Sequence, residues 1–128
     1  MHYSIGYDKG YWCPCCNKFF NDVDFLIENS WKCPDCKKYI YIAAPDLGHG
    51  YTLTRIPIRE LKQNDIVHLR GDEDIYPVIA IDYKSNGEVR VALKNYGSVT
   101  FKPTDFISVI MGGYYKDDWK DNSSDPCQ

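Results

Sequence analysis

Apolar and polar residues alternate with a period of two along most of the chain beyond residue 51, which is the pattern of half-buried β-strands. The Asn86-Gly87 pair lies between two such runs and predicts a tight hairpin turn. No run keeps a 3.6-residue period over the length of a long helix. The pattern therefore predicts a mainly β fold with five or six short strands, at residues 52–58, 66–70, 76–83, 88–94, 98–102 and 107–111. We expect these strands to form a small closed or half-closed barrel, because closure removes exposed strand edges.

The first third of the chain contains an internal repeat. Residues 11–20 read Tyr-Trp-Cys-Pro-Cys-Cys-Asn-Lys-Phe-Phe, and residues 31–40 read Trp-Lys-Cys-Pro-Asp-Cys-Lys-Lys-Tyr-Ile. Each copy has an aromatic residue ahead of its first cysteine, then proline, a variable residue and a second cysteine. The repeat predicts two similar turns, each followed by a short strand, and residues 21–30 are expected to join them as a polar loop or strand.

The composition changes at residues 43–50, which read Ala-Ala-Pro-Asp-Leu-Gly-His-Gly and are rich in residues that interrupt regular structure. A linker is expected there. We therefore expect four segments: a cysteine-containing domain at residues 1–44, the linker at 45–50, the small β-barrel at 51–111 and an acidic flexible tail at 112–128.

Four cysteines have the spacing expected of a tetrahedral four-thiolate metal site. Cys13 and Cys16 form one C-x2-C pair, and sixteen residues later Cys33 and Cys36 form a second. Four thiolates leave no open coordination position for water or substrate, so we expect one structural Zn²⁺ rather than a catalytic ion. A segment this short buries too little surface to fold by itself, and the metal supplies the missing stability.

Alternatives remain open for this cluster. Cys15 makes a Cys13-x-Cys15 pair conceivable, although the repeat aligns Cys15 with Asp35, a position that we expect to face solvent. Iron bound as in rubredoxins also suits paired turns of this kind. Those proteins generally have glycine after each turn, where this chain has Asn17 and Lys37. Four unconnected buried thiols are the remaining alternative.

Two parts of the chain resemble known families. The forms Cys-Pro-Cys-Cys-Asn-Lys and Cys-Pro-Asp-Cys-Lys-Lys resemble the paired knuckles of the zinc-ribbon family, over residues 10–42. That resemblance implies a β-ribbon held together by one ion. The segments at 64–69, 76–81 and 95–101 resemble the Tudor-like barrel group, over residues 62–110. Members of that group bind modified peptide side chains or nucleic acid, or act as protein-docking modules.

The net charge and the motifs of the chain limit the classes of function that are expected. The net charge of −3 and the pI of about 5.5 disfavour strong non-specific binding to phosphates, which normally needs a positive patch or stripe. No phosphate-binding glycine loop and no H-E-x-x-H motif occur in the sequence, so an enzyme is not expected. No secretory signal follows Met1 and no apolar run is long enough to span a membrane, so we expect a cytoplasmic protein.

Lysines and aromatics near the knuckles and in the barrel are the candidate binding residues. Zinc ribbons that resemble this one often present such tips to nucleic acid or to a large transcription or translation machine. Several aromatics meeting at one end of the barrel would form a cage for a methylated cation. The candidates are Lys18, Lys37, Lys38, Trp12 and Trp31 near the knuckles, and Tyr76, Tyr83, Tyr96 and Phe101 in the barrel.

These features together predict a non-enzymatic binding or adaptor protein that regulates or docks onto nucleic acid or a nucleic-acid-processing complex. The alternative is a protein-interaction module or an inhibitor of a host enzyme, of phage or mobile-element origin. The expected partners are a protein complex, a nucleic acid or both, without a membrane. The sequence leaves the oligomeric state open.

Overall fold

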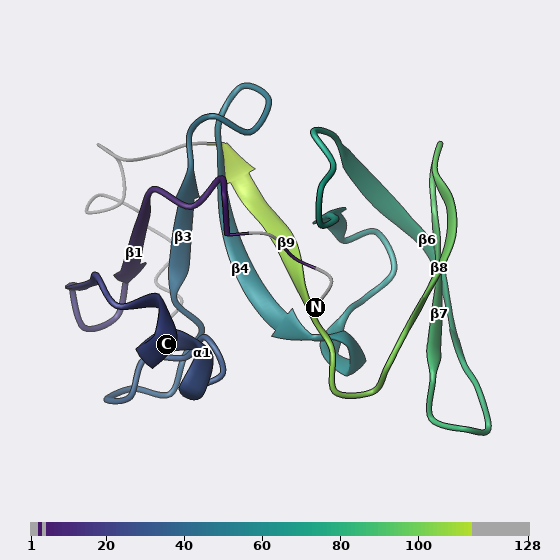
Figure 1. Cartoon of the computed structure of the whole chain (residues 1–128), viewed down its shortest axis with the longest axis horizontal. Helices are drawn as coiled ribbons and strands as arrows, with labels where there is room; N and C mark the ends of the chain where they lie inside the picture. Colours follow the sequence, from purple (N-terminus) through teal and green to yellow (C-terminus); the bar gives the residue numbers. More distant parts are fainter. Residues whose placement is uncertain (1–2, 4, 114–128) are drawn as a thin grey trace. The chain divides into compact units, whose positions relative to one another are not determined.

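The computed structural model of the chain describes residues 3 and 5–113. The chain divides into two compact units (Figure 1). The N-terminal unit comprises Ile5–Thr54 and the end of the last strand from Met111, and the C-terminal unit comprises Arg55–Ile110 and Tyr3. The nine described strands confirm the predicted mainly β fold, and β1, β2, β3 and β4 on the one hand and β5 to β9 on the other pair in antiparallel fashion.

The N-terminal unit is built on a small antiparallel sheet. Strand β1 pairs with β2 on one side and with β3 on the other, and β3 pairs with β4. One short helix, α1, follows β2. The bounds are Gly10–Cys13 for β1, Lys18–Phe20 for β2, Val23–Glu28 for α1, Tyr41–Ala44 for β3 and Tyr51–Pro57 for β4.

Helix α1 corrects the prediction of a polar loop or strand over residues 21–30. The Asp22 carboxylate caps the helix by accepting hydrogen bonds from the N–H groups of Asp24 and Phe25, which a helix start otherwise leaves unpaired. Leu26 is fully buried and anchors the helix to the unit. The cap and the buried Leu26 therefore stabilise a helix in a segment whose polar composition favoured a loop.

Residues 45–50, predicted as a linker, connect two strands that pair with each other. Ala44 pairs with Tyr51 at the end of the β3–β4 ladder, and Leu47 within the connection is fully buried. The N–H of Gly50 donates to the carbonyl oxygen of Leu47, which closes the turn. The two compact units divide further along the chain, between Thr54 and Arg55.

The C-terminal unit contains five strands in the order β9-β5-β6-β7-β8. The long strand β6 pairs with β5 through its first residues and with β7 through the rest, and the register shifts between Val78 and Ala80. Such a bulge bends a strand and lets it take part in two ladders. The bounds are Ile58–Glu60 for the 3₁₀ helix η1, Ile66–His68 for β5, Ile75–Tyr83 for β6, Val89–Leu93 for β7, Gly97–Phe101 for β8 and Phe106–Gly113 for β9.

The predicted Asn-Gly hairpin is confirmed between β6 and β7, which lie side by side in Figure 1. Gly87 has a φ of 89°, which glycine adopts at little cost. The pairing described for β8 is with β7, so closure of the sheet into a barrel stays a prediction. Residues 112 and 113 of the expected tail belong to β9, and the rest of that tail lies outside the described residues.

Apolar side chains from all five strands and η1 form the core of the C-terminal unit. Phe101 is the largest of them and is fully buried. The other buried members are Ile58, Leu61, Val67, Leu69, Val78, Val89, Val91, Leu93, Ile107 and Val109.

A candidate metal centre and the residues around it

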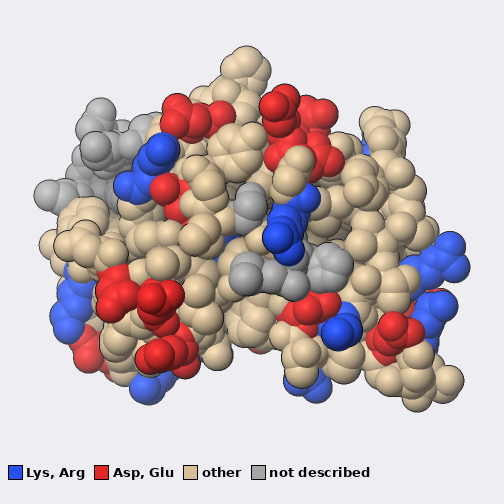
Figure 2. Space-filling view, viewed as in Figure 1, with Lys and Arg blue, Asp and Glu red and all other residues tan. Residues whose placement is uncertain are grey.

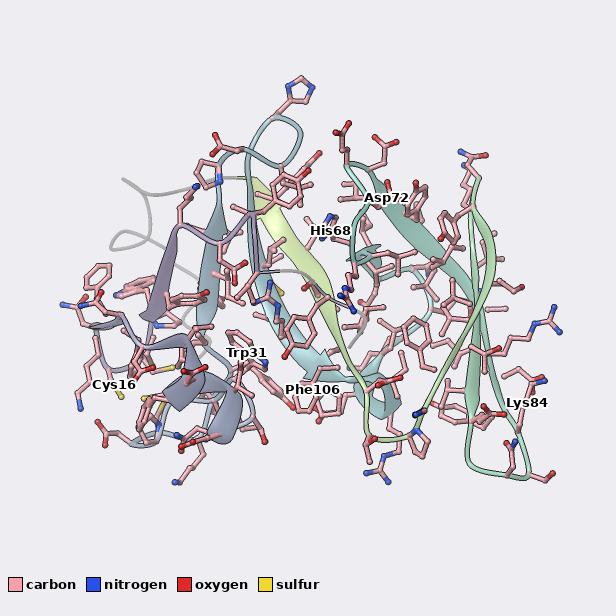
Figure 3. The ribbon with its side chains drawn as sticks, viewed as in Figure 1. Cys16, Trp31, His68, Asp72, Lys84 and Phe106 are labelled. Atoms are coloured by element: carbon pink, nitrogen blue, oxygen red, sulfur yellow. The ribbon has the colours of Figure 1, made fainter. Side chains whose placement is uncertain are left out.

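The four predicted cysteines lie together in the N-terminal unit. The Sγ atoms of Cys13, Cys16, Cys33 and Cys36 are all within 4.8 Å of one another, and Figure 3 shows the sulfur atoms gathered near the labelled Cys16. The Sγ of Cys13 is 3.5 Å from that of Cys36, and the Sγ of Cys33 is 3.8 Å from that of Cys16. Both distances greatly exceed a disulfide bond of about 2.05 Å.

The spacing of the thiols matches the edges of a metal tetrahedron. With Zn–S bonds of about 2.3 Å, neighbouring sulfur atoms of a regular tetrahedron are about 3.8 Å apart. The cluster can therefore hold one metal ion with small adjustments of the side chains. Cys15 is not a member of the cluster, in agreement with the repeat, which aligns it with Asp35.

Two similar turns supply the ligands. Cys13 is the last residue of β1, and the turn that contains Cys16 leads back into β2. In the second turn Cys33 and Cys36 lie between Lys32 and Tyr39, which form an isolated antiparallel bridge. Each turn therefore closes a short hairpin, and the two hairpins contribute two sulfur atoms each.

Backbone N–H groups point at one thiol in each turn. The N–H of Cys16 donates to the Sγ of Cys13, with the nitrogen and sulfur 3.4 Å apart, and the N–H of Cys15 also favours the ionised form of this thiol. The N–H groups of Cys36 and Asp35 act in the same way on Cys33. These donors disperse the negative charge of a thiolate, which is the role of groups that surround a metal's ligands.

Burial opposes this effect to different extents at the two thiols. Burial raises the pKa of the Cys13 thiol to about 12, against the hydrogen bond from Cys16. At Cys33 burial is again the largest single influence, but the backbone N–H groups and the neighbouring thiols together outweigh it and lower the pKa. The Cys13 and Cys33 thiols therefore differ in how readily they ionise, and a metal cation bound by thiolates favours the ionised form.

The residue after each turn has a left-handed backbone. Asn17 has a φ of 53° and Lys37 has a φ of 63°. Asparagine tolerates this region through its short polar side chain, whereas lysine does so only when the surrounding structure requires it. The two hairpins thus impose a backbone that usually favours glycine, although neither position is glycine here.

The lysines near the turns differ in their surroundings. Lys18 forms an ion pair with Asp35 of the opposite turn, and this contact raises the pKa of the Lys18 ammonium. The ammonium of Lys32 lies 4.9 Å from the centre of the Tyr39 ring, in a cation–π contact. Lys37 and Lys38 are exposed, and neither forms an ion pair with the described residues.

The two tryptophans predicted to bind a partner are buried. Trp12 is 2% exposed and Trp31 is 1% exposed. The indole N–H of Trp12 donates to the side-chain oxygen of Asn17, and the Trp31 ring packs 5.9 Å from the Tyr11 ring. Both rings therefore pack inside the unit that positions the cysteines, which does not agree with a role as an exposed contact.

Of the four barrel aromatics, two come together. The rings of Tyr76 and Tyr96 lie 4.8 Å apart, while Phe101 is fully buried in the core. Tyr83 is 57% exposed, and its hydroxyl contacts the carbonyl oxygen of Arg59. The structure thus brings together a pair of rings, to which Phe101 and Tyr83 do not belong.

An acidic residue that the sequence interpretation missed lies beside this pair. The Tyr76 hydroxyl donates to the Asp72 carboxylate over 2.8 Å, and the ring of His68 donates to the Asp72 carbonyl oxygen over 2.6 Å. The N–H of Asp74 and the Tyr76 hydroxyl hold the pKa of the Asp72 carboxyl below its usual value. Figure 3 labels His68 and Asp72 at this end of β6. Nothing in the sequence marks Asp72 among its acidic neighbours.

Comparisons with protein-family models, with curated proteins and with solved structures each found no match to this chain. Fold and site alone define the class: a mainly β protein with a four-cysteine cluster that can hold a metal ion. No helix within the described part of the chain has both the length and the apolar character needed to cross a membrane.

Proposed function

We propose that the four cysteines bind one structural zinc ion and that the N-terminal unit is a zinc ribbon. All four donors are sulfur atoms, in the spacing of a tetrahedral site, and this donor set suits Zn²⁺ in a closed structural site. Cys13 and Cys33 are fully buried, which limits access of water to the ion. The C-terminal unit, in this proposal, is a Tudor-like barrel.

The protein acts, in this proposal, as a non-enzymatic adaptor that docks onto nucleic acid or a nucleic-acid-processing complex. The supporting observation is the distribution of lysines around the second turn. Lys32, Lys37 and Lys38 all belong to this hairpin, and none of them is paired with a carboxylate within residues 5–113. Acidic and basic groups are interspersed on the face drawn in Figure 2. Against this mixed distribution of charge, three lysines on one hairpin are a local cationic feature.

Reversing two charges on this hairpin tests the docking role. The variant Lys37→Glu/Lys38→Glu is expected to bind a fluorescein-labelled single-stranded 12-nucleotide probe more weakly than the unmodified chain. Each lost phosphate contact removes about 0.7 from the slope of log affinity against log salt, so the double variant loses about 1.4. Fluorescence anisotropy at several salt concentrations measures both quantities.

Lys9→Glu is the matched control, because Lys9 is also exposed and lies just before β1, at the opposite end of that strand from Cys13. It changes the net charge of the chain as each of the two substitutions does. If Lys9→Glu weakens binding as much per reversed charge as the double variant does, binding depends on net charge alone, which would contradict docking through the second hairpin.

The second candidate function is a protein-interaction module, which the Tyr76–Tyr96 pair favours. Two rings beside an ionised carboxylate attract a cationic side chain, because the ring faces and the Asp72 carboxylate are both negative. Tyr96 is 50% exposed and leaves part of its ring open to a ligand. A methylated lysine side chain of a partner suits this combination of charge and apolar surface.

A peptide that contains trimethyllysine tests this second function, with a tert-butyl analogue as the neutral control. We expect Tyr96→Ala to weaken binding of the cationic peptide roughly tenfold, the scale of a desolvated cation–π contact. The exposed Tyr83→Ala serves as the matched control, and NMR titration gives the affinities. Because the pKa of Asp72 is lowered, its carboxylate stays charged at neutral pH, and affinity is expected to fall only at pH values below the ordinary titration range of an aspartate. Equal affinity for the tert-butyl peptide contradicts a cation site.

A further inference from the structure

Strand β8 has a partner strand on one side only. It ends the strand order β9-β5-β6-β7-β8, and its five residues pair with β7, which lies next to it in Figure 1. No strand within residues 5–113 pairs with its other side. The space around its first residue is open, because a Cβ added to Gly97 would meet nothing within 4 Å apart from its chain neighbours. A strand edge of this kind presents backbone N–H and C=O groups to a further strand.

The free edge of β8 lacks the features that usually keep other chains away. Proteins protect exposed edges with very short strands, charged residues, prolines or bulges. Strand β2, which pairs only with β1 among the described strands, has three residues and begins with Lys18. Strand β8 has five residues, Gly-Ser-Val-Thr-Phe, with no charge, no proline and no register shift against β7. Its β-branched and aromatic residues favour an extended strand that can pair again.

Val99 shows that the core side of β8 is incompletely covered. Its pair on β7, Val91, is fully buried, whereas Val99 packs against the same core and is only partly buried. Val91 has a paired strand on each side, β6 and β8, and Val99 has one on a single side. A further strand beside β8 would cover the rest of Val99 and add apolar burial to the backbone hydrogen bonds.

Strand β8 is complementary to itself in an antiparallel register centred on Val99. The register puts Val99 opposite Val99 of a second copy, Ser98 opposite Thr100, and Gly97 opposite Phe101. Serine and threonine hydroxyls bond across strands, and β-branched side chains in direct opposition pack well. Glycine adds no side chain that could collide with the buried ring of Phe101. Each pair in this register is therefore favourable or free of steric conflict.

The charges near β8 also suit a second copy. Lys102 is the only charged residue within residues 96–102, and the same register puts it opposite Tyr96. Like charges in direct opposition would destabilise the pairing, and none occur here. A strand of another protein would need its own matching pattern. A second copy supplies the pattern by two-fold symmetry, because the same patch serves both subunits.

We infer that β8 pairs antiparallel with β8 of a second copy and joins two C-terminal sheets into a symmetric dimer. This inference does not depend on the proposed docking function and concerns the oligomeric state, which the sequence leaves open. One pair of short strands buries much less than the roughly 1,600 Å² of a standard stable interface. The dimer therefore forms reversibly and is favoured at high chain concentration.

Two oppositely charged variants of the full chain test this register. Ser98 and Thr100 are both exposed, and we expect Ser98→Lys/Thr100→Lys and Ser98→Glu/Thr100→Glu to keep the fold. In either variant alone, two pairs of like charges face each other, so the dissociation constant of the dimer should rise about tenfold or more. An equal mixture of the two variants opposes unlike charges and should restore dimers. Sedimentation velocity at increasing concentration, with a thiol reductant present, measures each case.

Asp82→Lys is the matched control, because it changes the net charge by as much as Ser98→Lys/Thr100→Lys at an exposed position of β6, away from the free edge. It should dimerise like the unmodified chain, and thermal unfolding shows whether each variant keeps its fold. An unmodified chain that stays monomeric at the highest concentration overturns the inference. Dimers that persist in both charged variants, or equal weakening by Asp82→Lys, exclude β8 as the contact. A mixture that stays monomeric shows that the register is wrong.

Discussion

Cys33→Ser is expected to abolish metal binding by this chain and to unfold its N-terminal unit. Cys33 is fully buried, its thiol receives backbone N–H groups, and a serine hydroxyl does not ionise to replace the thiolate. Structural zinc contributes about 10–16 kcal/mol to small metal domains, as much as or more than the total stability of about 5–15 kcal/mol of a typical domain. Native mass spectrometry and NMR spectra of the full chain measure the loss of the ion and of the dispersed signals.

The matched control is Cys15→Ser, which removes a cysteine from the same turn but not from the cluster. We expect this variant to keep one ion per chain and the signals of the N-terminal unit. A chelator should unfold the N-terminal unit of the unmodified chain, and added Zn²⁺ should restore it. Retention of the ion by Cys33→Ser contradicts the ligand set.

The cysteine cluster could be predicted because its information is local. Two residues between cysteines fix the turn geometry, and the repeat aligns Cys16 with Cys36 and Cys15 with Asp35 without any knowledge of tertiary contacts. The Asn86-Gly87 hairpin is predictable for the same reason, because the glycine of this pair supplies the positive φ in the turn between β6 and β7. Both features depend on residues that lie close together in the sequence.

The binding residues were harder to predict, because exposure depends on contacts between distant segments. Trp12 and Trp31 flank the cysteines in sequence as a recognition tip would, yet both rings are buried. Lys18 looks as available as Lys38, but the fold places it against Asp35, seventeen residues away. Periodicity gives the side of a strand on which a residue lies and does not show what covers that side.

Helix α1 shows the same limit for secondary structure. Its six residues are too few for a periodic signal, and an isolated helix of that length is unstable in water. The contacts of Leu26 and the Asp22 cap stabilise it within the unit. Tertiary packing therefore determines this element, and the composition of residues 21–30 alone favours a loop.

The second large effect concerns Phe101, which the sequence placed among the candidate binding aromatics and the structure places in the core. Phe101→Ala is expected to lower the free energy of unfolding of the C-terminal unit by about 3–5 kcal/mol, because the substitution leaves a cavity among close-packed side chains. This loss is a large part of the total stability of a small domain. Urea denaturation followed by NMR signals of the C-terminal unit gives the difference.

Tyr83→Ala tests whether the size of the removed side chain or its burial causes the loss of stability. Tyr83 belongs to the same unit and has a side chain of similar volume, but it is 57% exposed, so its removal should change the stability by no more than about 0.5 kcal/mol. Phe101→Leu should lie between the two variants, since leucine refills much of the space. If Phe101→Ala leaves the unfolding midpoint unchanged, the ring is not packed in the core, and its place among the ligand-contacting aromatics has to be reconsidered.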